Sequence, residues 1–322
     1  MTMLANAFHT FQATGNREDL SDLISLISPK DTPLYDSIGS RSAQATLVEW
    51  QTDTLAAANP DNATLEGETF TAVARTPTNR LSNRCQIFNK MFTVTDTQEI
   101  VNKAGRGKES AYQMGNAMAE LKRDYEATLF DYGGSASGVA GISTRAARMR
   151  TLHAWIADVT TSTGSGANGN GGPGTYVPIT RAQYLSASAT AAPITEAWFN
   201  QILQNVWDQG GRPNAVYVGG GLSKTLAGWA TSTSRVWDGS KTVVNAIQVY
   251  ESMFGQLTVK LERFCGSSLG YIVDEKLWSK ATLKPTGLKN IGSRGLGNDF
   301  LVWSQWTLEA KNPSGNGMFI SG

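Results

Sequence analysis

The chain has 322 residues, and its 28 Lys and Arg against 27 Asp and Glu give a formal net charge of +1. So small a charge provides no strong positive field to hold nucleic acid, which argues against a dedicated DNA-binding protein. Charged residues make up 17% and hydrophobic residues 40% of the chain, a balance that excludes a charge-rich disordered protein and leaves enough apolar material for one large or two moderate domains.

The amino terminus, the lengths of the apolar runs and the two cysteines indicate where such a protein would be found. Met1–Ala13 lacks both a basic leader and a continuous apolar core, and no run of about 18 apolar residues occurs. We therefore expect a protein that is made in the cytoplasm and does not cross a membrane. Cys85 and Cys265 are too few for a disulfide framework, so they are expected to be buried free thiols.

The first part of the chain reads as an arm followed by strands. Asn16–Ile38 predicts a short helical turn and then an extended arm, because Pro29 and Pro33 both lack an amide donor and disfavour helix in the residue before them. The β-rich pattern that follows predicts strands at residues 45–51, 70–74 and 85–95.

Ser110–Phe130 is the strongest predicted helix. One apolar stripe runs along it, made of Ala111, Met114, Met118, Leu121, Tyr125 and Leu129. Ser110 with Gln113 fits a capping box at its start. The charged residues between the stripe positions are predicted to form a solvated face: Glu120, Lys122, Arg123, Asp124 and Glu126.

The second half alternates strand and helix signals. Leu152–Thr160 predicts a strand, and Thr195 predicts the N-cap of a helix that ends at Gly210-Gly211. A short buried strand is expected at 215–219 and a helix at 222–229, which suggests an α/β layer. The remaining predicted strands are 246–250, 257–264, 270–274 and 300–310.

No motif predicts a catalytic site, a cofactor or a metal. Gly164–Gly169 fits the dinucleotide pattern GxGxxG, but the Gly-rich run that follows and Pro173 do not supply the helix start that a pyrophosphate needs. His9 and His153 are the only histidines, and neither belongs to a recognisable triad or zinc motif. His153 is expected to be a hydrogen-bonded structural imidazole.

A hydrolase with a Ser nucleophile is an alternative for the central α/β part. It requires a Ser in a GxSxG turn between a strand and a helix. The nearest candidate is Gly219–Ser223, but Lys224 and Thr225 follow, so the second Gly is missing.

Several short motifs together resemble one family. Gly15–Leu20, followed by Ser28-Pro29 and Thr32-Pro33, resembles the amino-terminal arm of a group of tailed-bacteriophage major capsid proteins. Further matches follow in the same order along nearly the whole chain. They are Glu49–Asp53, Asn83 with Gln86–Phe88, Val94 with Thr97, Ala111–Gln113, Glu120–Asp124 with Glu126, Trp207 with Gly210-Gly211, Phe254-Gly255, and Thr307–Glu309.

This resemblance implies an α+β fold of the Hong Kong ninety-seven type. Laid on this sequence, residues 1–44 would be the N-arm and 45–95 the extended hairpin called the E-loop. Residues 96–184 would form the peripheral domain with its spine helix at 110–130. Residues 185–275 would be the axial domain, and 276–322 would return to the peripheral domain.

The implied function is structural. The chain would be a non-enzymatic major capsid protein of the virion, made in the host cytoplasm, that self-assembles into pentamers and hexamers of an icosahedral shell around phage DNA. Its partners would be other copies of itself, with scaffolding, portal and cement proteins, and it would contact DNA only weakly and non-specifically. A phage tail or baseplate protein is the alternative, and it would form rings or tubes.

In such a shell, an arm and a hairpin that cannot bury their apolar residues within one subunit bury them on neighbours, as large obligate interfaces do. The predicted contact residues are Trp50, Leu55, Phe70, Ile87, Phe88 and Phe92. The alternative for each of them is the core of its own subunit.

Overall fold

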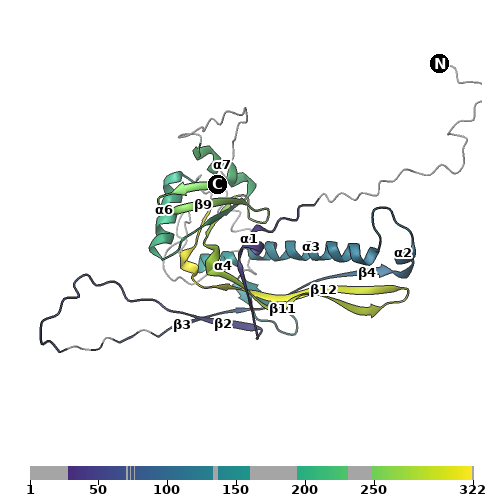
Figure 1. Ribbon diagram of the computed structural model, residues 1–322, viewed down its shortest axis with the longest axis horizontal. Helices are drawn as coiled ribbons and strands as arrows, with labels where there is room; N and C mark the ends of the chain where they lie inside the picture. The colour runs from purple at the N-terminus through teal and green to yellow at the C-terminus, as the bar shows by residue number, and fades with distance from the viewer. Residues whose placement is uncertain are drawn as a thin grey trace, which may run out of the picture.

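The computed structural model describes residues 28–69, 72, 74–75, 77–132, 137–159, 194–230 and 249–320. Figure 1 shows an elongated sheet with a long helix beside it, a second layered body at one end, and a hairpin that reaches away from both. In chain order the elements are α1 (Pro33–Ser37), β1 (Gly39–Ser42), β2 (Leu47–Thr52), β3 (Asn79–Arg84), β4 (Gln86–Thr95), α2 (Asp96–Ile100), α3 (Glu109–Leu129), β5 (Ser137–Val139), β6 (Arg148–Arg150), α4 (Leu152–Val159), α6 (Glu196–Asp208), β7 (Ala215–Val218), α7 (Gly220–Ala230), β8 (Val249–Ser252), β9 (Gly255–Leu261), β10 (Leu269–Val273), η1 (Glu275–Leu277), β11 (Trp278–Ser293), β12 (Gly297–Ala310), η2 (Pro313–Gly315) and β13 (Gly317–Ile320).

The elongated sheet has the strand order β1-β11-β12-β4. β11 and β12 form a long antiparallel pair, and β4 adds to the other edge of β12. Pro285 interrupts β11 because it has no amide hydrogen for the ladder, and the register between β11 and β12 shifts on both sides of it. The predicted strands at 85–95 and 300–310 are confirmed, whereas β11 was missed.

The long helix α3 confirms the prediction for 110–130 and packs along this sheet (Figure 1). Its stripe residues Leu121, Tyr125 and Leu129 are buried in the main core. The predicted capping box is wrong, because the helix begins one residue earlier. The amide and hydroxyl of Ser110 instead donate to the carboxylate of Glu99, at 3.1 and 2.9 Å, since the short helix α2 brings that side chain to the first turn.

The second sheet has the order β13-β10-β7-β9-β8, with β7 parallel to β9. β7 is buried on both faces: Tyr217 belongs to the main core, and Val216 to a second core formed with α6 and α7. The predicted helix from Thr195 is confirmed, and the Thr195 hydroxyl accepts the Trp198 amide at 3.4 Å. The strand at 215–219 and the helix at 222–229 are confirmed as well.

The strand predicted at Leu152–Thr160 is wrong, because Leu152–Val159 is the helix α4. A short, mostly apolar run has no clear periodicity, and residues 152–156 are all buried. The residue that could have indicated the start of this helix is Thr151, whose hydroxyl accepts the Ala154 amide at 3.3 Å.

The arm and hairpin predictions also need correction. Pro33 is the first residue of α1, a position where its missing amide costs nothing, so the predicted extended arm turns helical there. β2 confirms the strand predicted at 45–51. Its partner is β3. The strand expected at 70–74 is not tested, because Phe70 and residues 71 and 73 lie outside the described residues. The predicted motif at Gly164–Gly169 and the arm before residue 28 also lie outside them.

Candidate assembly interface

The hairpin of β2 and β3 projects from the body of the subunit and ends in a long loop (Figure 1). In that loop Leu55 is 94% and Leu65 79% exposed. Large apolar side chains that protrude this far gain nothing from their own subunit, and covering them with another protein would remove apolar surface from water. The hairpin loop is therefore the first candidate interface.

The base of the hairpin is fastened to the subunit by Trp50. Its indole Nε1 donates to the backbone carbonyl of Ala310 at 2.8 Å. The Trp50 ring also lies 5.5 Å from the ring of Trp155 on α4, centroid to centroid. Beside it, Asn83 of β3 donates to the carbonyl of Leu308 at 2.7 Å. Trp50 thus packs within its own subunit and orients the hairpin.

β4 presents two different faces. Phe88 is buried, with its ring 4.9 Å from that of Tyr125 on α3, and Phe92 stacks on Phe300 at 5.3 Å. Side chains alternate along a strand, so Ile87 and Met91 point to the opposite face, where they are 57% and 48% exposed. Phe88 and Phe92 consequently pack inside the subunit, and Ile87 is accessible.

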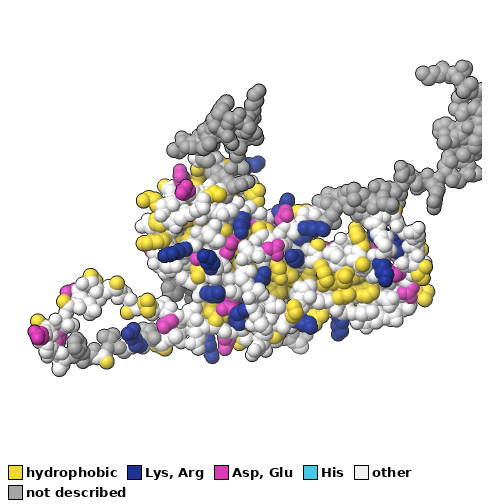
Figure 2. All heavy atoms as spheres, viewed as in Figure 1, with side chains coloured by type: hydrophobic (Ala, Val, Ile, Leu, Met, Phe, Trp, Pro, Cys, Tyr) yellow, Lys and Arg dark blue, Asp and Glu magenta, His cyan; other side chains and the backbone are white. Residues whose placement is uncertain are grey.

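The exposed side of this sheet forms a second candidate interface, which we call the outer sheet face: Ile87, Met91, Leu301 and Trp303. Met91 lies directly opposite Leu301 in the β4–β12 register, and cross-strand partners share a face. The hydrophobic side chains that gather along α3 and β4 in Figure 2 lie where α3 covers the sheet, and are distinct from the outer sheet face.

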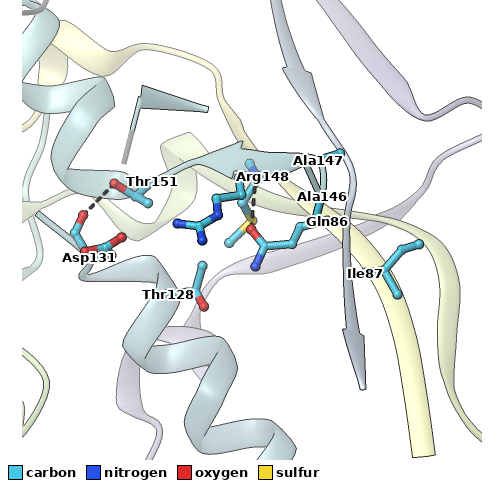
Figure 3. Close-up of a pocket in the computed structure, with 9 residues that line it drawn as sticks. Gln86, Ile87, Thr128, Asp131, Ala146, Ala147, Arg148 and Thr151 are labelled. Atoms are coloured by element: carbon cyan, nitrogen blue, oxygen red, sulfur yellow. Dashed lines mark hydrogen bonds between the residues drawn. The ribbon is translucent and has the colours of Figure 1, made fainter. Parts of the chain in front are cut away.

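A hollow of about 290 Å³ lies beside β4 (Figure 3). Two of its polar lining residues are paired, because Gln86 accepts the Met149 amide at 3.2 Å and Thr151 donates to the carbonyl of Asp131 at 2.8 Å. The Ile87 side chain lies on the opposite side of its strand from the other lining residues (Figure 3). With a small volume and a lining that includes Gln86, Thr128, Asp131, Arg148 and Thr151, the hollow does not resemble the mostly apolar pockets that bind small ligands.

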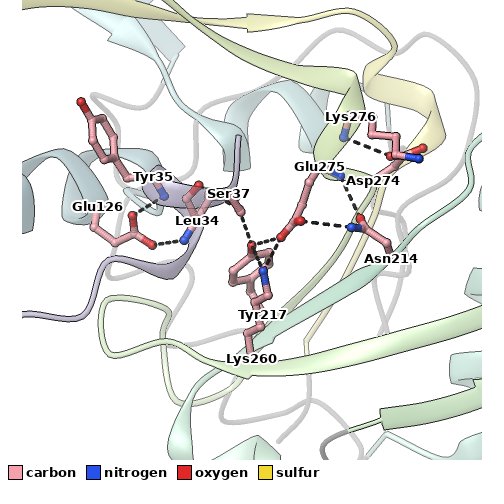
Figure 4. Close-up of polar contacts among 10 residues, drawn as sticks. All are labelled: Leu34, Tyr35, Ser37, Glu126, Asn214, Tyr217, Lys260, Asp274, Glu275 and Lys276. Carbon is pink, nitrogen blue, oxygen red and sulfur yellow. Dashed lines mark hydrogen bonds and ion pairs between the residues drawn. The ribbon is translucent and has the colours of Figure 1, made fainter. Parts of the chain in front are cut away.

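The helix α1 is fixed to α3 by a residue that the sequence placed on a solvated face. Glu126 is 0% exposed, which corrects that prediction. Its two carboxylate oxygens accept the amides of Leu34 and Tyr35, each at 2.8 Å (Figure 4). In the sequence, only the position of Glu126 next to Tyr125, at the edge of the apolar stripe, could have indicated that it is buried.

A polar network links α1 to the second sheet (Figure 4). Tyr217 of β7 bonds the hydroxyl of Ser37 at 3.0 Å and donates to the carboxylate of Glu275. Lys260 of β9 pairs with the same carboxylate at 2.6 Å, and Asn214 donates to it at 3.0 Å. Burial alone would raise the pKa of Glu275, but the hydrogen bonds from Lys260 and Tyr217 outweigh it and lower that pKa.

The groups considered for catalysis have structural roles. His153 is buried, its Nδ1 lies 2.9 Å from the hydroxyl of Tyr271, and burial lowers its pKa to about 4. The prediction of a structural imidazole is thus confirmed, on a helix and not on a strand. The hydroxyl of Ser223 donates to the carbonyl of Gly220 at 2.9 Å within α7. His9 lies outside the described residues.

Within the described ranges, no group of three or more His, Cys, Asp or Glu side chains could hold a metal ion. No helix in the same ranges is long and apolar enough to span a membrane. Cys85 and Cys265 are free and buried, as predicted.

Known proteins resemble the chain along almost its full length. It is 24% identical to the major capsid protein of Escherichia phage Phieco32 over 345 residues, which cover 98% of this chain and 96% of that protein. Its fold is similar to that of a chain in the capsid asymmetric unit of cyanophage A-1(L), with a TM-score of 0.64, 10% identity and 97% of each chain covered. A chain from Gordonia phage Cozz is similar with a TM-score of 0.57 and 10% identity, covering 98% of this chain and 95% of that one.

These structural neighbours share the fold of tailed-phage capsid proteins, which confirms the α+β, Hong Kong ninety-seven type of fold. The model of the SU10 major capsid protein family matches residues 5–321. The chain therefore belongs to the SU10 major capsid protein family, whose members are structural subunits of phage capsids.

Proposed function

We propose that this capsid subunit forms pentamers and hexamers of a closed icosahedral shell around phage DNA and catalyses no reaction. The observation that carries the proposal is the projecting hairpin, whose loop exposes 94% of Leu55. A free subunit gains no stability from such a group, but a neighbouring subunit can cover it.

We assign the segments of the chain as in the resemblance. Residues 1–44 act as the N-arm, 45–95 as the E-loop, 96–184 as the peripheral domain with its spine helix, 185–275 as the axial domain and 276–322 as the return. Two strand pairings favour different bounds for the E-loop and for the return segment. β4 pairs with β12, so only β2, β3 and their loop project, and β13 pairs with β10 of the second sheet.

The six predicted contact residues divide into two roles under this proposal. Leu55, Phe70 and Ile87 contact a neighbouring subunit. Trp50, Phe88 and Phe92 hold the hairpin and β4 in position, since their rings pack inside their own subunit. Their contacts with a neighbour are then indirect.

The remaining partners follow from the same role. We propose that scaffolding, portal and cement proteins bind the assembling shell, and that the chain is made in the host cytoplasm before it enters the virion. The net charge of +1 supports weak, non-specific contact with packaged DNA.

Two substitutions of Leu55 test the proposal. Leu55→Asp places a charge where a neighbour would cover the side chain, so assembly is expected to fail, while Leu55→Met keeps the site apolar and is expected to assemble. Neither changes the fold of the free subunit, because the side chain is almost fully exposed. Sedimentation velocity measures the assembled fraction, and circular dichroism of the free subunit controls for folding. Equal assembly of Leu55→Asp and Leu55→Met contradicts the role of the hairpin loop.

A further inference from the structure

Two buried carboxyl groups meet between the layers of the subunit. Glu126 projects from α3, is 0% exposed and holds the amides of Leu34 and Tyr35 of α1. Glu262 follows the last residue of β9 and is 3% exposed. Its backbone amide still donates to the carbonyl of Val218 at 2.9 Å, which ties it to the second sheet.

The two carboxylate oxygens of Glu262 differ in their hydrogen bonds. Oε1 accepts the amide of Phe264 at 3.0 Å. Oε2 is buried and has no hydrogen-bond donor among the described residues, although the Glu262 carboxyl lies within hydrogen-bonding reach of Glu126. Two carboxylates repel each other and can hydrogen-bond only through a proton, so a pair buried in this way is stable when it carries one.

The surrounding charges do not provide a close cation for the pair. Burial comes first and the Glu262 carboxyl second among the causes that raise the pKa of Glu126 to about 8, while the two α1 amides act against them. Burial likewise raises the pKa of Glu262, while the hydrogen bonds from the Phe264 amide and with Glu126, and last the Arg263 charge, oppose it. The titratable and charged groups around the pair include Tyr35 and Asp36 of α1, Lys122, Asp124 and Tyr125 of α3, Tyr217 of β7, Lys260 of β9, which pairs with Glu275 of η1, Arg263 and Cys265 after β9, and Lys280 of β11.

Of the nearby cations, Arg263 is mostly exposed, with its guanidinium 3.9 Å from Asp31. Lys280 donates to the backbone carbonyl of Tyr35; burial lowers its pKa, and the charges of Asp36 and Glu126 act against that. Neither lies within ion-pair distance of Glu126 or Glu262 among the described contacts, so the charge of Lys280 acts on Glu126 only from farther away and does not replace the proton.

We propose that one proton shared by Glu126 and Glu262 fastens the end of β9 to the α1–α3 layer, and that losing this proton in mildly alkaline solution opens the joint. The ionised pair repels, and Glu126 keeps its two bonds to α1. The segment that moves is therefore the turn after β9, which carries Glu262, Phe264 and Cys265. This pH-dependent joint does not depend on whether the hairpin loop contacts a neighbouring subunit.

The direction of the pH effect follows from proton linkage. A carboxyl whose pKa is raised on folding binds its proton more tightly in the folded state than in the unfolded one. Its contribution to stability is complete below the ordinary value of 4.5 and is lost as the pH rises through about 8. The joint is thus closed in weakly acidic solution and opens on the alkaline side of neutrality.

Glu262→Gln is the sharpest test, because the amide mimics the protonated pair. Its oxygen can still accept the Phe264 amide, and its NH₂ group can donate permanently to Glu126. Glu251→Gln is the matched control, since Glu251 is exposed at the neighbouring edge of the same sheet. Hydrogen exchange of the full-length chain is followed by mass spectrometry at about pH 6 and about pH 10, and protection factors are corrected for intrinsic exchange.

In the wild-type chain and in Glu251→Gln, protection of residues 261–266 is expected to fall at least about tenfold between the two pH values, whereas in Glu262→Gln it stays constant. Unchanged protection in the wild type, or an equal fall in Glu262→Gln, overturns the proposal. Infrared spectroscopy of the wild-type chain gives a second readout that needs no variant. A protonated carboxyl band at neutral pH that disappears on the alkaline side is expected, and its absence at neutral pH refutes the shared proton.

Discussion

The indole Nε1 of Trp50 donates a hydrogen bond of 2.8 Å to the backbone carbonyl of Ala310, so the base of the projecting hairpin is tied to the end of β12. Because β12 is also the central partner of β4 and β11, the direction in which the hairpin leaves the subunit is set by the most extensively paired strand of the elongated sheet.

Two substitutions of Trp50 separate the contribution of this hydrogen bond to stability from that of the ring packing. Trp50→Phe keeps an aromatic ring near Trp155 but removes the donor, so we expect a loss of about 1 kcal/mol in the free energy of unfolding. Trp50→Ala also removes the ring and is expected to lose about 3 kcal/mol. Denaturant unfolding of the free subunit measures both. Identical stability of the two variants would show that the hydrogen bond, and not the ring contact, accounts for the role of Trp50.

Tyr125 joins the spine helix to the sheet through its hydroxyl, which lies 3.1 Å from Thr286 and 2.5 Å from Ser304. Tyr125→Phe leaves the buried Ser304 hydroxyl without this partner and is expected to cost about 1–3 kcal/mol. Ser304→Ala provides the matching half of a double-mutant cycle. If the two residues act together, the double variant loses less than the sum of the single losses. A strictly additive loss would contradict the coupling.

The ion pair of Lys260 and Glu275 gives an acid-dependent stability. The pKa of Glu275 is lowered in the folded state, so its contribution is present above the ordinary carboxyl value and is lost as the pH falls through the lowered one. Lys260→Met is expected to cost about 2 kcal/mol at neutral pH and to flatten the decline in acid. Lys224→Met, at an exposed position on α7, is the control. A Lys260→Met protein with the wild-type acid profile would rule out this role.

His153 makes the stability of the fold depend on pH in a second range, different from that of Glu275. Burial lowers its pKa from 6.5 to about 4, so the folded state binds fewer protons than the unfolded chain between these values. Stability is therefore expected to be full above about pH 6.5 and to fall toward pH 4. His153→Phe should remove this slope, and thermal unfolding across the window measures it. The slope persisting unchanged in the variant would assign it to other groups.

The sequence predicted the elements whose pattern is local. α3 has a continuous apolar stripe, α6 has Thr195 as its cap, and β7 is a short apolar run between loop signals; all three form where they were expected. α4 was mistaken for a strand because Leu152–Ile156, all buried, is too short and too apolar a run to reveal a helical period. β11 was missed because Pro285 interrupts its pattern.

The candidate interface was less accessible to sequence reasoning. The motifs include Trp50 and Ile87, but whether a side chain of β4 faces its own core or solvent depends on a pairing between β4 and β12 that spans about two hundred residues. The joint of Glu126 and Glu262 was invisible for the same reason. Its two carboxyls lie on separate elements, and only the fold brings them together.

Cryo-electron microscopy of particles formed by the full-length chain tests the central claim most directly. The account predicts closed icosahedral shells of pentamers and hexamers, in which density from a neighbouring subunit covers Leu55 of each hairpin loop. Open tubes or stacked rings, or closed shells in which the hairpin loops stay uncovered, would contradict it.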